Sequence, residues 1–531
     1  MSPPTFNLID QPWIPVETAA GPRRLSLLDT LHRSHTLDGI SGDSPLTTAA
    51  VFRLLLAVLH AALRGPRSNS ERLKLWREGR WDPDTITAYL RRWHDRFDLF
   101  HSEWPFYQCG GFEITKPKSV AFIAPELASG NNATLFDHTL ETDPPAIDPA
   151  TAALWLIRVQ TFCLGGLDKS TSNLFGVSPS FYASPASQGA MVMPLGDNLF
   201  ETLLFNLTPY DATRPFPTRP DVPDLPTWER SSGPQPGPRP PSGYLDYLTW
   251  PSRIIRLEPE STEEGDWIVR RVHISQGCQI DRVTLEWDPF LAWRSSAKSS
   301  YPLRVSADRS LWRDANALFS FADKQPGAGV GKVGRAAIVG ELQNLIDEAD
   351  DVECRALSVA GLENDQARFI CWRHEELPVG RPLLSDPNCV AFLESAIQTG
   401  EQVGDHLKNS VREVARGIVK PNEPGGANRE DVDRVVDSWQ LPERYYPVLE
   451  APFNQLLAAL AEATTDSERD AALLSWRSRV CATARGAFVE TTQLAGSDWK
   501  ALKAVTSGSR LLNFLLRSHQ PEKPEEKESS E

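Results

Sequence analysis

Beyond residue 388 the sequence changes to an almost continuous helical periodicity, and this change limits the possible folds more than any other feature. In the first stretch, apolar residues recur mostly at spacings of three and four, as they do on one face of a helix: Val390, Leu393, Ile397, Val403, Leu407, Val411, Val414 and Ile418. Similar stretches follow at 432–460, 466–488 and 499–516, separated by short connections. Four amphipathic helices of this kind predict a four-helix bundle over residues 381–518.

The first 380 residues mix strand-like and helix-like segments, which predicts a separate α/β domain over 1–380. The segment FNLIDQPWIPV near the start is rich in aromatic and β-branched residues and is interrupted by proline, so we expect a short strand pair or an edge strand. Residues 44–65 begin with Ser44-Pro45 and are apolar on nearly every face, which predicts a helix inside a large core. Further strand-like runs occur at 199–209, 247–259, 267–276 and 282–293. The fold class is therefore α+β.

Two segments are not expected to belong to either core. Residues 209–242 contain eleven prolines. Because proline removes a backbone donor and fixes φ, this segment cannot form the interior of a helix or sheet, and it is either a surface excursion or a linker. The acidic residues 519–531 are poor in apolar side chains, which predicts a disordered tail.

Charge and cysteine content exclude several classes of protein. The net charge is −15, which argues against a generic nucleic-acid coat protein, yet residues 291–340 carry eight Lys or Arg against three Asp. A DNA partner is thus permitted and not demonstrated. The seven cysteines are scattered without a CxxC pair, so neither a disulfide framework nor a four-thiolate zinc site is expected.

There is no uncharged apolar run long enough to span a membrane and no secretory signal, which predicts a cytoplasmic protein.

Motifs that would indicate catalysis are missing. The segment GAGVGKVG at 327–334 resembles a phosphate-binding loop, but Pro326 and Val333 occupy the positions of the required Gly and Ser or Thr. The sequence contains no HExxH and no GxSxG motif. We therefore expect no enzymatic activity, no catalytic residue, no metal ion and no cofactor.

Three polar segments suit binding instead. The first is ELASGNNATLF at 126–136, a small polar loop that ends at the apolar Phe136. The second is QTFCLGGLDKS at 160–170, where Gly165-Gly166 lets the backbone approach a ligand and Lys169 can meet a phosphate. The third is GLENDQARF at 361–369, which by itself indicates only a hairpin or turn.

Taken in order, these segments resemble the CasA-type large subunits of the type I-E CRISPR Cascade complex. The resemblance is carried by FNLIDQPWIPV, WPFYQ (104–108), GNNATLF, the Gly-Gly-x-x-Lys-Ser loop, GYLDYLTWPSRIIRLEP (243–259) and NDQA (364–367), followed by the helical bundle. It implies a large N-terminal α/β domain of unusual fold. It also implies a subunit that inspects duplex DNA for a protospacer-adjacent motif (PAM), helps to open it and recruits the Cas helicase–nuclease, while guide pairing reads the target.

The resemblance also implies roles for individual residues. Gly165 and Gly166, with Lys169, match the glycine loop that meets the PAM minor groove. Gln366 matches a wedge that separates the first base pair, with Asp365 and Ala367 beside it. Two candidates for a minor-groove finger are Arg282 and Lys298. Asn131, Asn132 and Phe136 match the loop that docks toward the guide handle and its neighbouring subunit.

This sequence departs from the family pattern at two positions. Cys163 stands where relatives have another glycine, and Asp365 stands where a neutral amide is expected. A carboxylate facing a phosphate or a minor groove is unfavourable, which suggests an altered PAM preference or register.

The implied partners are the crRNA, the backbone subunits, the small-subunit dimer, the handle-end subunit, PAM-containing double-stranded DNA and the helicase–nuclease, with no membrane. Two other readings remain. One is a structural scaffold that does not read the PAM, and the other is a nuclease-bearing subunit.

Overall fold

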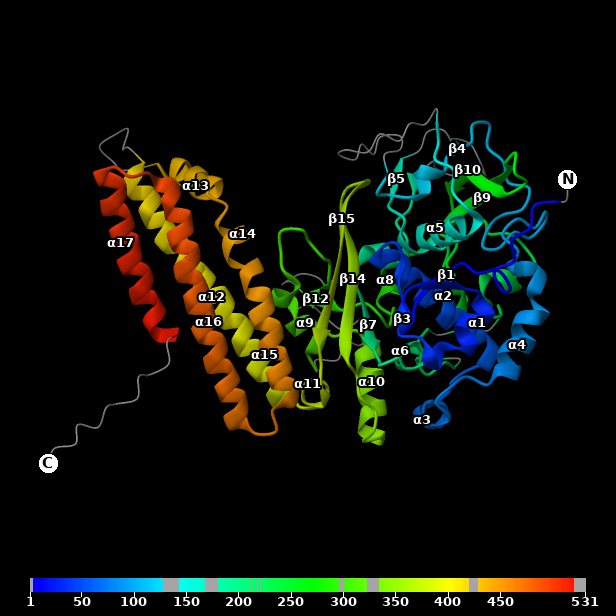
Figure 1. Cartoon of the computed structure of the whole chain (residues 1–531), viewed down its shortest axis with the longest axis horizontal. Helices are drawn as coiled ribbons and strands as arrows, with labels where there is room; N and C mark the ends of the chain where they lie inside the picture. The colour runs from blue at the N-terminus through cyan, green and yellow to red at the C-terminus, as the bar shows by residue number, and fades with distance from the viewer. Residues whose placement is uncertain are drawn as a thin grey trace. The chain divides into compact units, whose positions relative to one another are not determined.

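The computed structural model describes residues 3–127, 143–167, 180–211, 213–216, 218–219, 221–295, 300–321, 334–419 and 428–519. The chain divides into two compact units (Figure 1). The N-terminal unit consists of Met1–Ser306 with Ala322–Glu376, and the C-terminal unit consists of Ala307–Phe321 with Leu377–Glu531. The division at Glu376 lies close to the predicted domain boundary at residue 380. No sequence signal predicted that residues 307–321 would pack with the helices of the second unit.

The core of the N-terminal unit is built around α2 (Pro45–Leu63). Ser44 caps this helix by accepting a hydrogen bond from the amide of Thr47, as the Ser-Pro start predicted. The helix is long and apolar enough to cross a membrane, but 78% of its most apolar stretch is buried against the rest of the unit. It packs against α5 (Pro149–Phe162) and α7 (Tyr244–Leu248), so its composition is explained by burial in a core.

Strands of the N-terminal unit form several small sheets. In one of them β1 (Ile14–Glu17) lies between β2 (Arg23–Leu25) and β3 (Gly39–Ile40). Of the two expectations for this segment, the strand pair is confirmed, since β1 pairs with β2, and the edge strand is wrong, because β1 pairs on both sides. A second three-stranded sheet has the strand order β4 (Lys118–Ser119), β10 (Trp267–Gln276), β9 (Arg253–Ser261). A third has the order β15 (Arg368–Pro378), β14 (Ala356–Asp365), β7 (Met191–Leu195).

The strand predicted at 199–209 is wrong as well. Residues Leu199–Asn206 form the helix α6, which Asn198 caps by accepting from the amide of Glu201. Seven of its eight residues are buried, and a short run that is apolar on all sides has no period that separates helix from strand. The remaining α-helices among the described residues of the unit are α1 (Leu27–His32), α3 (Asn69–Glu78), α4 (Pro83–Arg92), α8 (Arg282–Leu285) and α10 (Ala337–Glu348).

The proline-rich segment 209–242 packs onto the N-terminal unit. Phe216 and Trp228 are buried. Arg230 and Arg239 both form ion pairs with the buried carboxylate of Asp246. Both flanks of the segment belong to this unit. Its only strand among the described residues is β8 (Gly237–Pro238), a two-residue parallel pair with β11 (Cys278–Gln279) that the proline content did not predict.

In its described residues from 381 onward, the C-terminal unit is helical. The long helix α12 (Pro387–Ile418) packs against α16 (Asp466–Thr492) and α17 (Trp499–Leu515), and α15 (Glu450–Glu462) packs against α16. The second predicted stretch is divided into α13 (Arg429–Ser438), α14 (Leu441–Tyr445) and α15. The chain breaks at Gln440, whose φ is +49°, and prolines follow at 442 and 447.

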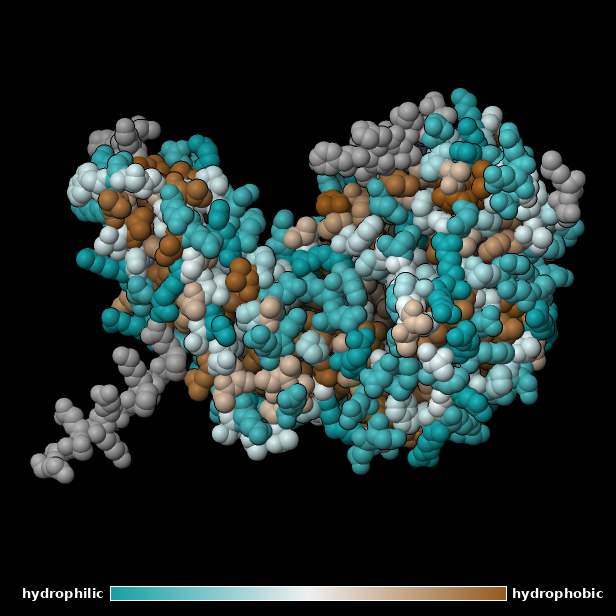
Figure 2. Space-filling view, viewed as in Figure 1, coloured by the Kyte–Doolittle hydropathy of each residue, from teal (hydrophilic) through white to brown (hydrophobic). Residues whose placement is uncertain are grey.

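The segment 307–321, which contains α9 (Asn316–Phe319), supplies a large aromatic residue to this helical unit. The Trp312 ring meets the ring of Trp476 edge-on at 5.6 Å between centroids and is completely buried. On the surface, Figure 2 shows apolar side chains among hydrophilic ones over the C-terminal helices. The exposed large apolar residues in this unit are Val448, Leu474, Val489, Leu494, Trp499, Leu502 and Phe514.

Candidate nucleic-acid interface

The hairpin formed by β14 and β15 ends in the sequence that the family resemblance singled out. The predicted hairpin or turn at 361–369 is a hairpin, with Gln366 and Ala367 between the strands. Residues 365–368 are exposed. Gln366 has a φ of +53°, a conformation that residues other than Gly, Asn and Asp seldom adopt. The Nδ2 amide of Asn364 donates a hydrogen bond to the carbonyl of Gln366 at 2.6 Å, which holds the turn in this shape.

The two glycines lie in a short segment that follows the end of α5, in which Gly165 directly precedes the strand β5 and Gly166 begins it. Cys163 is the extended residue after the helix, and β5 (Gly166–Leu167) then pairs in antiparallel fashion with β6 (Ser180–Phe181). A Cβ atom added to Gly165 would lie 3.3 Å from backbone atoms of Phe181 and Ala183, so the close packing of two chain segments favours glycine there. The side chain of Leu167 is 64% exposed, which places β5 at the surface.

The glycine strand and the hairpin tip meet. A Cβ atom added to Gly166 would lie 3.1 Å from the Cβ of Ala367, closer than ordinary van der Waals contact. Both segments belong to the N-terminal unit, and Figure 1 shows the tip of the long hairpin at the end of this unit where β5 lies. Two segments about two hundred positions apart in the sequence thus form one surface feature.

Arg253 fixes the backbone around the glycines. This arginine begins β9 and is only 3% exposed. Its Nη2 donates to the carbonyl of Leu164 at 2.5 Å, and its Nη1 donates to the carbonyl of Tyr182 at 2.8 Å. The guanidinium also lies over the ring of Phe181 at 4.6 Å from the centroid. Burial lowers the pKa of Arg253. The two carbonyls and the ring replace part of the hydration that the guanidinium loses when it is buried.

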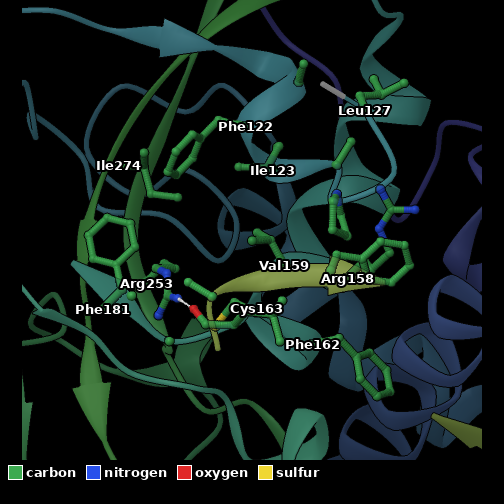
Figure 3. Close-up of a pocket in the computed structure, with 18 of the residues that line it drawn as sticks. Phe122, Ile123, Leu127, Arg158, Val159, Phe162, Cys163, Phe181, Arg253 and Ile274 are labelled. Carbon is green, nitrogen blue, oxygen red and sulfur yellow. Dashed lines mark hydrogen bonds between the residues drawn. The ribbon is translucent and has the colours of Figure 1, made fainter. Parts of the chain in front are cut away.

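A cavity of about 340 Å³ lies beneath these segments and is lined by both of them (Figure 3). Its walls are mainly apolar and include Phe122, Ile123, Val159, Phe162 and Ile274, and the hairpin contributes Ala367, Arg368 and Phe369. Arg158 reaches the cavity from α5 and is paired with Glu126 at 2.8 Å and with Asp43 at 3.6 Å. The buried cations of this cavity are therefore engaged within the protein. The parts of the site that reach the surface are the backbone of the glycine segment and the tip of the β14–β15 hairpin.

Comparison with known proteins decides the family. The family described as CRISPR-associated protein Cse1 matches residues 7–487. The CRISPR-associated protein CasA/Cse1 of Thermus thermophilus is 36% identical over 524 residues, which cover 96% of this chain and 97% of that protein. The chain belongs to the Cse1 family.

Solved structures agree with this assignment. The Cse1 crystal structure from Acidimicrobium ferrooxidans has a TM-score of 0.80 and 25% identity, over 98% of this chain and 99% of that one. A chain of a CRISPR RNA-guided surveillance complex has a TM-score of 0.72 and 22% identity, over 97% of this chain and all of that chain, and this likeness shows the shared fold. The resemblance inferred from the sequence is confirmed, and so is the α+β class with C-terminal helices.

The structure of this Cse1-family chain brings together only part of the predicted site. Gly165, Gly166, Gln366 and Ala367 lie close to one another, with the exposed Asp365 at the same tip. Arg282 is the first residue of α8. The remaining predicted residues lie outside the described ranges: Lys169, Lys298, Asn131, Asn132 and Phe136.

Cys163 does not lie on the exposed edge of the glycine segment. Its side chain is 6% exposed and lines the cavity below, where its thiol lies 3.8 Å from the carbonyl of Tyr182. A side chain larger than glycine is accommodated there because it points inward.

The basic segment 291–340 is divided between the two units. Its residues 307–321 belong to the C-terminal unit, whereas the residues on either side belong to the N-terminal unit. Arg309 pairs with Asp314 at 2.9 Å and Arg313 pairs with Glu401 at 2.5 Å. These two arginines are therefore partly neutralised within their own unit. Among the described residues there is also no group of three or more His, Cys, Asp or Glu side chains that could hold a metal ion.

Sequence reasoning missed Arg253 as a residue of the site. It lies within the segment GYLDYLTWPSRIIRLEP, which contributed to the family resemblance, but no role was assigned to it. The available signal was a basic residue directly before Ile254 and Ile255, where a buried strand would leave it needing partners.

Proposed function

We propose that this chain is the large subunit of a crRNA-guided type I-E Cascade complex, which recognises the PAM in duplex DNA and opens the adjacent base pair. Membership of the Cse1 family and the fold shared with a chain of a CRISPR RNA-guided surveillance complex support a place in such an assembly. The observation that carries the finer proposal is the contact of the glycine strand with the hairpin tip at Gly166 and Ala367. A surface that binds a duplex and a tip that enters it must lie side by side.

In this proposal the glycine strand binds the minor groove. The minor groove is only about 6 Å wide, so a backbone without side chains enters it more easily than a strand that carries them. Gly165 and Gly166 provide such a backbone at the surface, and Arg253 holds it from below. Lys169 would contact a phosphate, and either Arg282 or Lys298 would serve as the basic finger.

Gln366 acts as the wedge. Its side chain is exposed at the turn, and its amide can both donate and accept hydrogen bonds from base edges that lose their partners. Unstacking one base step costs about a few kcal/mol, which contacts to the separated strands and guide pairing recover. Ala367 completes the tip. The carboxylate of Asp365 repels phosphates, and the exposed Arg368 next to the turn offsets that charge.

The remaining partners are assigned to other parts of the chain. The loop with Asn131, Asn132 and Phe136 would dock toward the guide handle and the handle-end subunit. The helices of the C-terminal unit would contact the small-subunit dimer, and the exposed Trp499, Leu502 and Phe514 of α17 offer an apolar surface for this contact. The assembled complex would recruit the helicase–nuclease, and the chain itself would bind without catalysing a reaction.

The test uses the reconstituted complex with Gln366→Ala. We expect the rate of R-loop formation on a PAM-containing target to fall, while binding of the complex to DNA that lacks a PAM stays unchanged. The exposed Gln11 offers a matched control, since Gln11→Ala removes the same amide elsewhere on the N-terminal unit. Equal R-loop rates for all three proteins would refute the wedge.

A structural scaffold remains the alternative, and the net charge of −15 together with Asp365 favours it over generic DNA binding. The two readings differ in PAM dependence. If complexes with and without this chain bind PAM and non-PAM duplexes equally well, the chain is a scaffold.

A further inference from the structure

A second cavity of the N-terminal unit lies apart from the glycine strand and the hairpin tip, and its lining residues are a different set. It has a volume of about 220 Å³ and lies between the segment 96–108 and the proline-rich excursion, with Pro251 beside them. Three arginines line it, namely Arg96, Arg230 and Arg239, together with the aromatic residues Trp104, Tyr107 and Trp228. We call this site the arginine cavity.

The arginine cavity carries an excess of positive charge. Arg230 and Arg239 share a single carboxylate, that of Asp246, at 2.9 and 2.6 Å, and this side chain is completely buried. Arg96 has no carboxylate partner within the part of the chain that the structure describes. Its Nη1 donates to the carbonyl of Arg230 at 3.3 Å. Among the ion pairs of the described residues, these three guanidinium groups thus have one carboxylate partner, Asp246, in a chain whose net charge is −15.

One of these arginines also has a donor without a protein partner. The Nε of Arg230 is buried and makes no hydrogen bond among the described residues. The Nη2 of the same side chain is already used by the carbonyl of Leu225 and the hydroxyl of Ser242. A buried guanidinium N–H that lacks an acceptor is costly, so this side chain has hydrogen-bonding capacity that the described residues do not use.

The aromatic side chains give the cavity flat surfaces for a planar group. The guanidinium of Arg96 lies 3.9 Å from the centroid of the Trp104 ring. The guanidinium of Arg239, which also lines the cavity, lies 4.1 Å from the centroid of the Trp250 ring, and Trp250 itself is buried and is not a lining residue. Stacked arginine and tryptophan planes are the surfaces on which unpaired nucleobases stack, and arginine forks match the oxygens of a phosphate.

We propose that the arginine cavity binds one nucleotide of a single-stranded nucleic acid. The base stacks against the pair of Arg96 and Trp104, and the phosphate accepts hydrogen bonds from Arg230. An acidic peptide would use the charges but not the aromatic planes, so the combination favours a nucleotide. The nucleotide can come from an RNA or from a separated DNA strand, and the chemistry of the site is the same for both. This proposal does not depend on PAM reading, because it concerns a different surface.

The experiment uses the full-length purified chain and two fluorescent probes, an RNA and a DNA of about ten nucleotides each that carry a photoreactive thio-base. Binding is measured by anisotropy at low salt, and the crosslinked residue is identified by mass spectrometry. We expect a crosslink at Trp104 or Tyr107. Loss of one stacking and charge partner in Arg96→Gln should weaken binding by about tenfold. The probe that binds more tightly identifies the source of the nucleotide.

Arg92→Gln is the matched control. Arg92 lies over the ring of Trp93 at 5.4 Å from its centroid, yet it does not line the cavity, so its removal should leave the affinity unchanged. Trp104→Leu is a second variant, and thermal unfolding of each protein shows whether it has folded. Three results would overturn the proposal. The first is an affinity for the probes that neither Arg96→Gln nor Trp104→Leu changes. The second is crosslinking only at residues outside the cavity. The third is displacement of both probes by polyglutamate that binds more tightly than either probe, which would indicate that the cavity binds an acidic protein segment.

Discussion

The side chain of Ala367 occupies the space into which a side chain at Gly166 would project, with only 3.1 Å between the Cβ of Ala367 and a Cβ added to Gly166. The glycine therefore serves the packing of the hairpin tip against β5 as well as any close approach of a ligand. This relationship connects the two halves of the proposed PAM site physically. A substitution in one half should therefore alter the packing of the other half.

The first prediction tests this coupling. Gly166→Ala should lower the free energy of unfolding of the N-terminal unit by about 1 kcal/mol, because the neighbouring tip must shift by a few tenths of an ångström. Ala367→Gly in the same chain should restore part of that loss, since it removes the crowded methyl group. Denaturant unfolding of both single variants and the double variant measures the coupling. Strictly additive effects would mean that the two segments do not press on each other.

A second prediction concerns Arg253. Arg253→Met removes the donors that bind the carbonyls of Leu164 and Tyr182 and leaves both acceptors buried, so the free energy of unfolding should fall by about 2–4 kcal/mol. Hydrogen exchange at residues 164–167 should become faster. Arg256→Met on the same strand is the control, because Arg256 binds the carbonyl of Phe112 and the carboxylate of Glu113 instead. Equal exchange rates at 164–167 in the wild type and Arg253→Met would contradict the assigned role.

Much of the architecture could be predicted from the sequence, where local signals are strong. The helix over 45–63 follows from the Ser44 cap and an unbroken apolar run, and α12 follows from its spacing. The tip at 364–367 follows from turn chemistry. The failures occur where tertiary packing decides. A buried eight-residue run at 199–206 carries no period, and β1 is central only because two separate segments pair with it.

The candidate site was harder to predict than the fold. Its residues come from segments far apart in the sequence, and no local pattern reports that Gly166 and Ala367 touch. The role of Arg253 depends on the carbonyls of Leu164 and Tyr182, which come from other segments. In the C-terminal unit, the role of Trp312 depends in the same way on Trp476. Family resemblance located the loops, whereas their contact had to be seen in three dimensions.

A third prediction is a dependence of stability on pH that comes from His60. This imidazole is completely buried, its Nδ1 lies 3.0 Å from the carbonyl of Gly65, and burial together with the positive charge of Arg72 lowers its pKa to about 3. The unfolded chain takes up the proton near pH 6.5, whereas the folded protein does not. Stability should therefore be fully present above about pH 6.5 and fall as the pH decreases toward 3.

The size of this effect follows from linkage. At pH 4.5 the contribution of His60 amounts to a loss of roughly 2–3 kcal/mol in the free energy of unfolding. Urea unfolding at pH 7 and pH 4.5 measures it. His60→Gln should reduce the difference between the two pH values, whereas His35→Gln, at an exposed histidine, should leave it as in the wild type. If His60→Gln and the wild type show the same pH dependence, the acid sensitivity arises elsewhere.

The last prediction separates two glycines of the C-terminal unit. A side chain at Gly400 on α12 would lie 2.7 Å from the ring of Trp312, which the segment 307–321 inserts between the helices. Gly400→Ala should therefore lower the free energy of unfolding of this unit by about 1–3 kcal/mol, because the buried indole cannot move away without disturbing Trp476. At Gly486 on α16 nothing lies within 4 Å of an added Cβ. Gly486→Ala should raise that free energy by about 0.5–1 kcal/mol, since alanine favours a helix interior over glycine. Thermal unfolding of the two variants gives the sign in each case, and a stabilising Gly400→Ala would show that Trp312 does not pack as described.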